Sequence, residues 1–180
     1  MNLMSKEHQE PYKMDNYNKE EKCLSIIKCG CPSSTSIPTT TAAGTSFTLA
    51  ALTLDTSCLC NPDIILEFAS NTIATAFRGT LNISVFKQCR CQVRPIPIGG
   101  TWTLQLGLAE GTVVTDARTF SFSICDSDSC DKDCCTYTVV ATVVATVVGA
   151  ATAGTLAINN ATLGAIATCR EECNECKREH

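Results

Sequence analysis

Residues 101–108 read TWTLQLGL, and residues 119–124 read TFSFSI. In both stretches every second residue is a large apolar one, and Thr, Ser, Gln or Gly stands between. Successive side chains of a β-strand point to opposite faces, so this alternation predicts strands with one buried and one exposed face. Three further stretches are strand candidates: residues 46–54, 63–69 and 81–85.

Turn signals separate the predicted strands: Asn61-Pro62, Arg78-Gly79, residues 95–100 and Glu110-Gly111. Short strands at such spacing are typical of a two-layer all-β fold. We therefore predict an all-β jelly roll or β-sandwich. Its expected core contains Leu81, Ile83, Val85, Phe120, Phe122 and Ile124.

Residues 137–154, YTVVATVVATVVGAATAG, are long and apolar enough to suggest a transmembrane helix. However, Val and Thr favour strands, and no basic cluster or aromatic belt flanks the stretch. We predict a long strand or hairpin, without a membrane span, that continues through residues 155–168. Asn159-Asn160 is a candidate turn, and residues 137–148 are expected to offer an edge on which subunits pair.

Composition divides the 180-residue chain into one domain with two tails. Residues 1–22 are polar and charged, lack the apolar region of a signal peptide, and are expected to form a disordered arm or connector. Residues 23–168 form the predicted β-domain. Residues 169–180, CREECNECKREH, form a charged, cysteine-rich tail. The net charge of −4 argues against a nucleic-acid partner.

The 14 cysteines exceed what a domain of this size needs for folding. Such cysteine usage indicates an oxidising or metal-rich location. The polar N-terminal segment shows no export signal, which conflicts with an oxidising location. A protein made in a mother cell and released by lysis escapes this conflict, so we expect a spore-surface or extracellular location.

Cysteine spacing predicts where the thiols point. Three pairs have one residue between their cysteines: Cys29/Cys31, Cys58/Cys60 and Cys89/Cys91. In a strand, both thiols of such a pair point the same way, so they suit a bond to a neighbouring strand or another chain. The adjacent Cys134 and Cys135 would instead point to opposite faces.

We expect the cysteines to fall into two groups. The candidate inter-subunit thiols are Cys23, Cys29, Cys31, Cys134, Cys135, Cys169, Cys173 and Cys176. The candidate intra-domain thiols are Cys58, Cys60, Cys89, Cys91, Cys125 and Cys130.

Catalytic patterns are missing from the sequence. Both histidines, His8 and His180, lie in the predicted tails, where no base is held beside a nucleophile. No nucleophile elbow, phosphate-binding loop, dinucleotide fingerprint or zinc-protease motif occurs, and the acidic residues of the domain are scattered. We predict a protein that is not an enzyme and uses no cofactor.

Two stretches suggest metals but fit them poorly. Residues 125–135 are acidic, yet Cys130, Asp131 and Tyr137 stand where a calcium loop needs an oxygen ligand, Gly and Glu. A solvated acidic loop is the expected alternative. The cysteines of residues 169–180 and His180 would form a stripe about 16 Å long on a helix, too long for one zinc ion. Cross-linking thiols fit this tail better, and no metal site is predicted.

Four stretches together resemble a known family: residues 53–73 (TLDTSCLCNPDIILEFASNTI), 81–89 (LNISVFKQC), 97–104 (PIGGTWTL) and 120–143. They resemble a cysteine-rich domain of unknown function from anaerobic spore-forming bacteria, whose cysteine blocks match in order. That family is similar in design to endospore appendage (Ena) subunits, which are jelly rolls polymerised by inter-subunit disulfides. The resemblance implies a flexible connector that bonds cysteines on the sheets of preceding subunits, with Cys23 as the candidate connector thiol.

The leading hypothesis is a structural subunit that assembles with itself into a disulfide-cross-linked fibre, like an endospore appendage or pilus, or into a spore-surface layer. Other spore-surface proteins are further candidate partners. Two alternatives stay open. One is a monomeric, disulfide-rich β-sandwich module that binds carbohydrate or another surface. The other is a thiolate metal-binding protein, because C-x-C pairs also suit copper(I) or zinc.

Overall fold

The computed structural model describes residues 25–59, 61–90, 92–107, 115–127, 134–146 and 154–169. Every regular element in these ranges is a β-strand. The strands are β1 (Ser25–Cys29), β2 (Ser33–Pro38), β3 (Ser46–Asp55), β4 (Pro62–Thr75), β5 (Gly79–Cys89), β6 (Ile96–Leu106), β7 (Thr115–Asp126), β8 (Cys134–Thr146) and β9 (Thr155–Cys169). Within the described ranges, no helix of the length and apolarity needed to cross a membrane is found.

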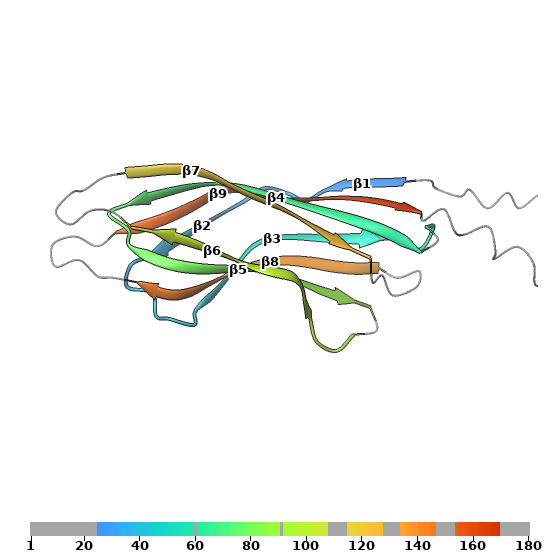
Figure 1. Ribbon diagram of the computed structural model, residues 1–180, viewed down its shortest axis with the longest axis horizontal. Helices are drawn as coiled ribbons and strands as arrows, with labels where there is room; N and C mark the ends of the chain where they lie inside the picture. The colour runs from blue at the N-terminus through green and yellow to red at the C-terminus, as the bar shows by residue number, and fades with distance from the viewer. Residues whose placement is uncertain are drawn as a thin grey trace, which may run out of the picture.

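The strands form two antiparallel sheets that lie face to face along the long axis of the molecule (Figure 1). Sheet A has the order β1-β9-β4-β7, and β2 also pairs with β9. Sheet B has the order β3-β8-β5-β6. With β1 and β2 taken as one interrupted strand, these orders are those of a jelly roll, in which the chain passes repeatedly between two four-stranded sheets. The predicted all-β jelly roll is confirmed.

One edge of sheet A is an interrupted strand that the sequence analysis did not predict. β1 pairs with the second half of β9, from Ser25↔Thr168 to Cys29↔Gly164. β2 pairs with the first half of β9 and ends at Pro38↔Thr155. Between them, the Gly30 N–H donates a hydrogen bond to the Leu163 carbonyl at 2.8 Å. The long strand β9 therefore holds both short segments in line.

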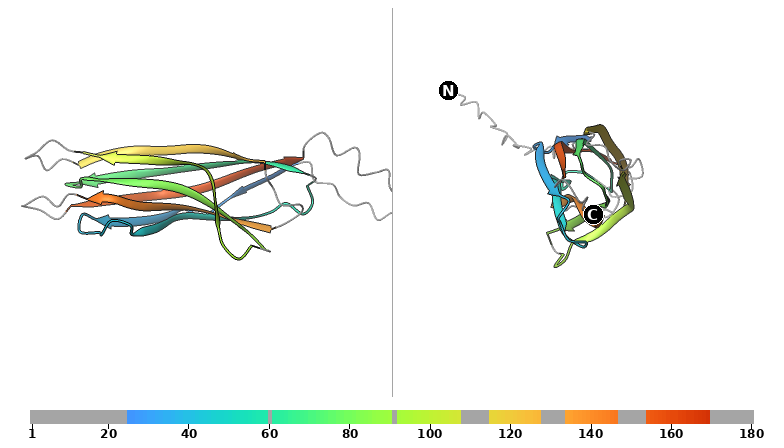
Figure 2. Two further views of the ribbon diagram at one scale, coloured as in Figure 1. Left: turned by 60° about the horizontal axis from the view of Figure 1, so that its bottom comes forward. Right: turned by 90° about the vertical axis from the view of Figure 1, so that its left-hand side faces the viewer.

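The end-on view in Figure 2 shows the strands of the two sheets facing one another. The buried apolar side chains of these strands form the core. Leu81, Ile83, Val85 and Ile124 are buried as predicted. Phe120 and Phe122 are only half-buried, because β7 is an edge strand whose neighbour in the sheet is β4 alone.

An aromatic cluster closes the sandwich on the side of β6 and β7. Trp102 of β6 stacks on Phe122 of β7, with ring centroids 4.0 Å apart and an interplanar angle of 15°. Phe122 in turn stacks on the buried Phe68 of β4 at 5.1 Å. These rings join the two sheets across the edge at which neither β6 nor β7 has an outer partner strand.

Two predicted turns are β-bulges instead. At Asn160, β9 continues through a register shift between Ala69↔Thr162 and Asn71↔Asn159, and Asn160 takes a φ of 53°. An extra residue in one strand is accommodated in this way without ending the strand. The Asn159-Asn160 turn was therefore a wrong prediction.

The Gly-rich stretch before Trp102 behaves in the same way. β6 already begins at Ile96, and its register shifts between Ile83↔Trp102 and Val85↔Ile98. Gly99 lies in this shift with a φ of 65°, and a Cβ there would come within 3.1 Å of Ile124. Glycine thus permits both the backbone conformation and the close packing.

The predicted pairing edge at residues 137–148 is also wrong. The described part of this stretch belongs to β8, which lies between β3 and β5 in sheet B. Both of its backbone edges are used within the sheet. The edges open to another chain are those of β1, β2 and β7 in sheet A, and of β3 and β6 in sheet B.

Candidate functional site

The outer face of sheet A carries an apolar row that ends in a thiol. Ile27 on β1, Ile166 on β9, Ile65 on β4 and Cys125 on β7 are successive register partners across the four strands. The three isoleucines are 75%, 40% and 41% exposed, in that order, and the Cys125 thiol is free and exposed. Directly opposite side chains on one face lie close enough to contact one another. The row is therefore a continuous apolar strip beside a reactive group.

A second thiol lies two residues further along the same face. Cys29 is opposite Gly164, and Gly164 is opposite Glu67. Because Gly164 has no side chain, a hollow of about 130 Å³ forms between the two rows, and its lining includes Cys29 and Glu67. A larger hollow of about 490 Å³ continues over β4 and β7. Cys29 thus borders the smaller of these two hollows on the outer face of sheet A.

Cys29 and Cys31 are free, exposed thiols on either side of Gly30. Cys29 ends β1 and Cys31 precedes β2, so this pair spans a break between strands and does not lie within one strand. Cys29 and Cys125 stand on strands three inter-strand spacings apart, about 14 Å. A disulfide brings its two Cα atoms within about 7 Å. These two thiols therefore cannot bond each other on the rigid sheet.

Other cysteines of the domain form disulfides. Cys89 and Cys135 are register partners on β5 and β8, with Cα atoms 4.0 Å apart, and they form a disulfide in the core. For Cys89, a bond within the domain is the expected one. The inter-subunit assignment of Cys135 is wrong, because its side chain points inward. Cys134 is half-buried on the alternate face of the strand. Cys58 is disulfide-bonded as well, although it is exposed in the turn after β3.

The position of Cys125 also differs from the expected one. Cys125, expected to bond within the domain, has a free thiol on the outer face of sheet A. The alternation along β7 explains this, because Ile124 and Asp126 take the inward positions on either side of it. Cys169, assigned to the tail, is the half-buried last residue of β9. The other candidate thiols lie outside the described residues: Cys23, Cys60, Cys91, Cys130, Cys173 and Cys176.

Sequence reasoning missed a buried polar cluster. Asp126, expected in a solvated acidic loop, is the buried last residue of β7. Its carboxylate pairs with Lys87 and accepts a hydrogen bond from the Tyr137 hydroxyl. The signal was present in the sequence, because Lys87 shares the inward parity of Leu81, Ile83 and Val85. In the described parts of the chain, no group of His, Cys, Asp and Glu residues is arranged to hold a metal ion.

Residues 23–168 match the family described as "Domain of unknown function (DUF4489)". The chain belongs to this family. The DUF4489 match covers both sheets, from before β1 almost to the end of β9. No curated protein matches the sequence.

Several solved structures are similar to part of this chain. The structure of the infectious bursal disease virus Gx strain covers 82% of this chain at 9% identity and a TM-score of 0.42. The VP2 subviral particle of that virus covers 81% at 14% identity, also with a TM-score of 0.42. The tailspike protein 4 of bacteriophage CBA120 covers 80% at 10% identity, with a TM-score of 0.29. The DUF4489 chain spans 38%, 38% and 20% of these chains, respectively.

Proposed function

We propose that this DUF4489 protein is a structural subunit that polymerises with itself into a fibre or layer, and that disulfides between subunits lock the polymer. One observation carries the proposal: some of the described cysteines are bonded in the core, whereas others are free on the surface. Cys89 and Cys135 are buried and bonded inside the domain. Cys29, Cys31 and Cys125 are free and exposed, and Cys29 and Cys125 flank one face of sheet A.

The positions of the exposed thiols favour bonds to another chain. Cys29 and Cys125 are held too far apart to bond each other, so each needs a thiol brought by another segment. The row of Ile27, Ile65 and Ile166 lies between them, and contiguous exposed apolar surface of this kind marks contact sites. A subunit that covers this row would bury apolar area and bring its own thiols near Cys29 and Cys125. Docking thus precedes covalent locking.

Sheet edges supply a second means of docking. β7 on one side of sheet A and β1 with β2 on the other have backbone groups without a partner strand in the sheets. An extended segment of a second subunit can add to such an edge through main-chain hydrogen bonds. Backbone pairing fixes the register, which then decides which thiols meet.

The proposed location of the polymer is the spore surface, and the resemblance to cysteine-rich domains of spore-forming bacteria supports this part of the proposal. In this proposal the subunit is made in the mother cell and reaches oxidising surroundings on lysis. Disulfides then form outside the reducing cytoplasm. Other surface proteins of the spore are the further partners that such a polymer would meet.

Electrophoresis of the oxidised full-length protein tests the proposal. We expect multimers that survive boiling in detergent and disappear with reductant and heat. The triple variant Cys29→Ser/Cys31→Ser/Cys125→Ser should form several-fold fewer multimers. Cys89→Ala/Cys135→Ala removes the buried disulfide and, under conditions in which circular dichroism shows a folded domain, should leave the multimers in place.

Two other outcomes would change either the proposed function or the choice of cross-linking cysteines. A single monomer band without reductant would overturn the polymer and favour the monomeric binding module. Multimers that withstand the triple variant would mean that other cysteines form the cross-links. Cys23→Ser and a deletion of residues 169–180 would then identify which tail carries them.

A further inference from the structure

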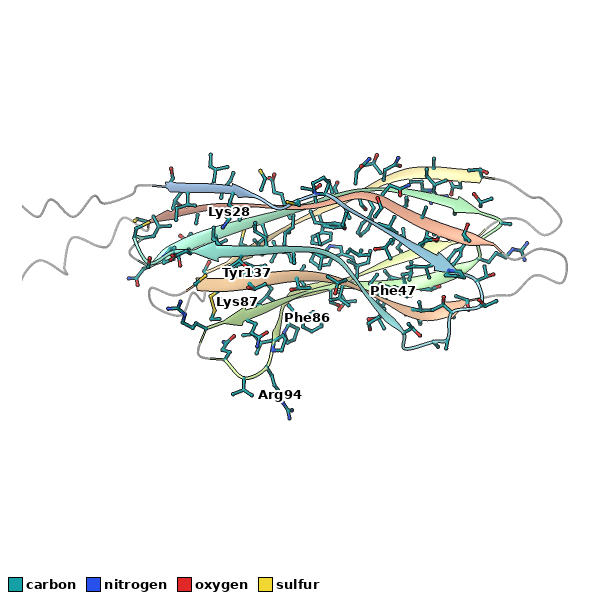
Figure 3. All side chains as sticks on the ribbon, turned by 180° about the vertical axis from the view of Figure 1, so that it is seen from behind. Lys28, Phe47, Phe86, Lys87, Arg94 and Tyr137 are labelled. Carbon is teal, nitrogen blue, oxygen red and sulfur yellow. A yellow bond between two sulfur atoms is a disulfide. The ribbon has the colours of Figure 1, made fainter. Side chains whose placement is uncertain are left out.

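A buried polar triad joins the two sheets at one end of the sandwich. The Lys87 Nζ lies 2.8 Å from Asp126 Oδ2, and the Tyr137 hydroxyl donates a hydrogen bond of 2.8 Å to the same oxygen. Lys87, Asp126 and Tyr137 are 2%, 5% and 0% exposed. Lys87 and Tyr137 are cross-strand partners in sheet B, whereas Asp126 ends β7 of sheet A. Figure 3 shows the Lys87 and Tyr137 side chains at the same end of the molecule.

Stabilisation of the fold by an ion pair alone does not explain why Lys87 and Asp126 are buried in the core. Removing both charges from water costs more than their attraction returns in many proteins, and apolar residues of similar volume often stabilise a core at least as well. Another described ion pair, Arg118–Asp116, lies on a single strand with Arg118 well exposed, so it links no layers. The Lys87–Asp126 contact is different because it places an amine directly against a carboxyl group across the core.

We propose that Lys87 and Asp126 condense into an isopeptide bond, which covalently joins the two sheets. The lone pair of the Lys87 Nζ, once the ammonium has given up a proton, attacks Cγ of Asp126. A C–N bond forms and one C–O bond breaks. The oxygen leaves as water with the two protons that the nitrogen loses. Ammonium plus carboxylate gives amide plus water, so the step needs no oxidant and no further reactant.

The surroundings favour this condensation. The sheets hold the amine and the carboxyl in contact, which replaces a bimolecular encounter by an intramolecular one. The Tyr137 hydroxyl, bound to Oδ2, is placed to donate a proton to the oxygen that leaves. Burial excludes the bulk water that would favour hydrolysis. The product amide carries no charge, so the reaction also removes two buried charges from the core.

The bond would secure a strand that is otherwise weakly held. β7 is an edge strand of sheet A, hydrogen-bonded to β4 on one side. The amide would anchor its end to β5 in sheet B, next to the Cys89–Cys135 disulfide that ties β5 to β8. Reductant opens the disulfide but not the amide. A subunit released from a disulfide-locked polymer would therefore keep its two layers joined.

Intact mass of the fully reduced, alkylated and denatured full-length protein tests this inference. We expect a mass lower than that of the sequence by one water molecule. A digest should contain a branched peptide that joins Lys87 to Asp126. Lys87→Arg keeps the positive charge but replaces the amine, and its mass should show no loss. Tyr137→Phe should lower the cross-linked fraction several-fold at a fixed time after synthesis.

Two results would overturn the inference. Aged wild-type protein with the full sequence mass would show that Lys87 and Asp126 remain an ion pair. Loss of water that persists in Lys87→Arg would place the dehydration at another site. The wild-type mass decides the matter even where a variant fails to fold. It does so independently of polymer formation, because monomer and multimer give the same reduced mass per chain.

Discussion

Cys89 and Cys135 lie directly opposite each other on neighbouring strands β5 and β8, and their disulfide joins positions 46 residues apart in the sequence. The loop that it closes contains β6 and β7, the two strands that flank the aromatic cluster. The bond thus restricts the conformations that this part of the chain can adopt in the unfolded state.

Removing this disulfide should weaken the domain strongly. For a loop of this length, chain entropy predicts that Cys89→Ala/Cys135→Ala lowers the free energy of unfolding by about 4 kcal/mol. Urea denaturation followed by circular dichroism measures the difference. Cys125→Ala, on the exposed face, is the control and should change the free energy by less than about 0.5 kcal/mol. Equal effects of the two changes would contradict the buried position of the bond.

Thiol accessibility should separate the two cysteine populations. In the native protein without reductant, a small alkylating reagent should label Cys29, Cys31 and Cys125 rapidly in the monomer fraction, because their thiols are free and exposed. Cys89 and Cys135 should be labelled only after unfolding and reduction. Peptide mapping by mass spectrometry reads both groups in one experiment. Protection of Cys125 equal to that of Cys89 would count against the outward direction of Cys125.

Close packing requires a glycine at position 154, immediately before β9. A Cβ at this position would lie 2.1 Å from the Ala76 carbonyl oxygen, which is backbone and cannot rotate away. Gly154→Ala should therefore destabilise the domain by about 3 kcal/mol, the upper part of the range for overpacking. Gly107→Ala has open space around its new methyl group and serves as the matched control. Thermal unfolding of both variants provides the comparison.

The stack of Trp102 on Phe122 gives an optical test of the β6–β7 edge. Trp102 is the one tryptophan of the chain, so its fluorescence reports on this cluster alone. Phe122→Ala should move the emission to longer wavelength, because the indole loses its cover. It should also lower the free energy of unfolding by about 2 kcal/mol, less than for a fully buried phenylalanine. Ser121→Ala, on the outer face of β7, should change neither property.

Strands β3 to β7 could be predicted from the sequence, because side-chain alternation is a local property; the short strands β1 and β2 were missed. The inward parity of Leu81, Ile83 and Val85 can be read without any knowledge of neighbouring strands. The same parity, followed from Ile124, would also have placed Asp126 inward and Cys125 outward. Lys87 also follows the inward parity of this strand, but a charged side chain is not normally expected in a core.

What escaped prediction depends on contacts between distant parts of the chain. The position of β8 inside sheet B, and so the loss of its edges, follows from pairing with β3 and β5. The split of Cys134 and Cys135 across two faces was predictable. Only the register with Cys89 shows which of the two is bonded inside. The glycines before Trp102 indicated a turn, but they form a bulge because β6 pairs with β5 on both sides of them.

Electron microscopy of the purified, oxidised full-length protein tests the central claim most directly. We predict fibres or layers that disperse into single subunits after treatment with reductant and heat. The variant Cys29→Ser/Cys31→Ser/Cys125→Ser, prepared in the same way, should show far fewer of them. Isolated particles of subunit size in the oxidised wild-type sample would contradict the account of this protein as a self-assembling structural subunit.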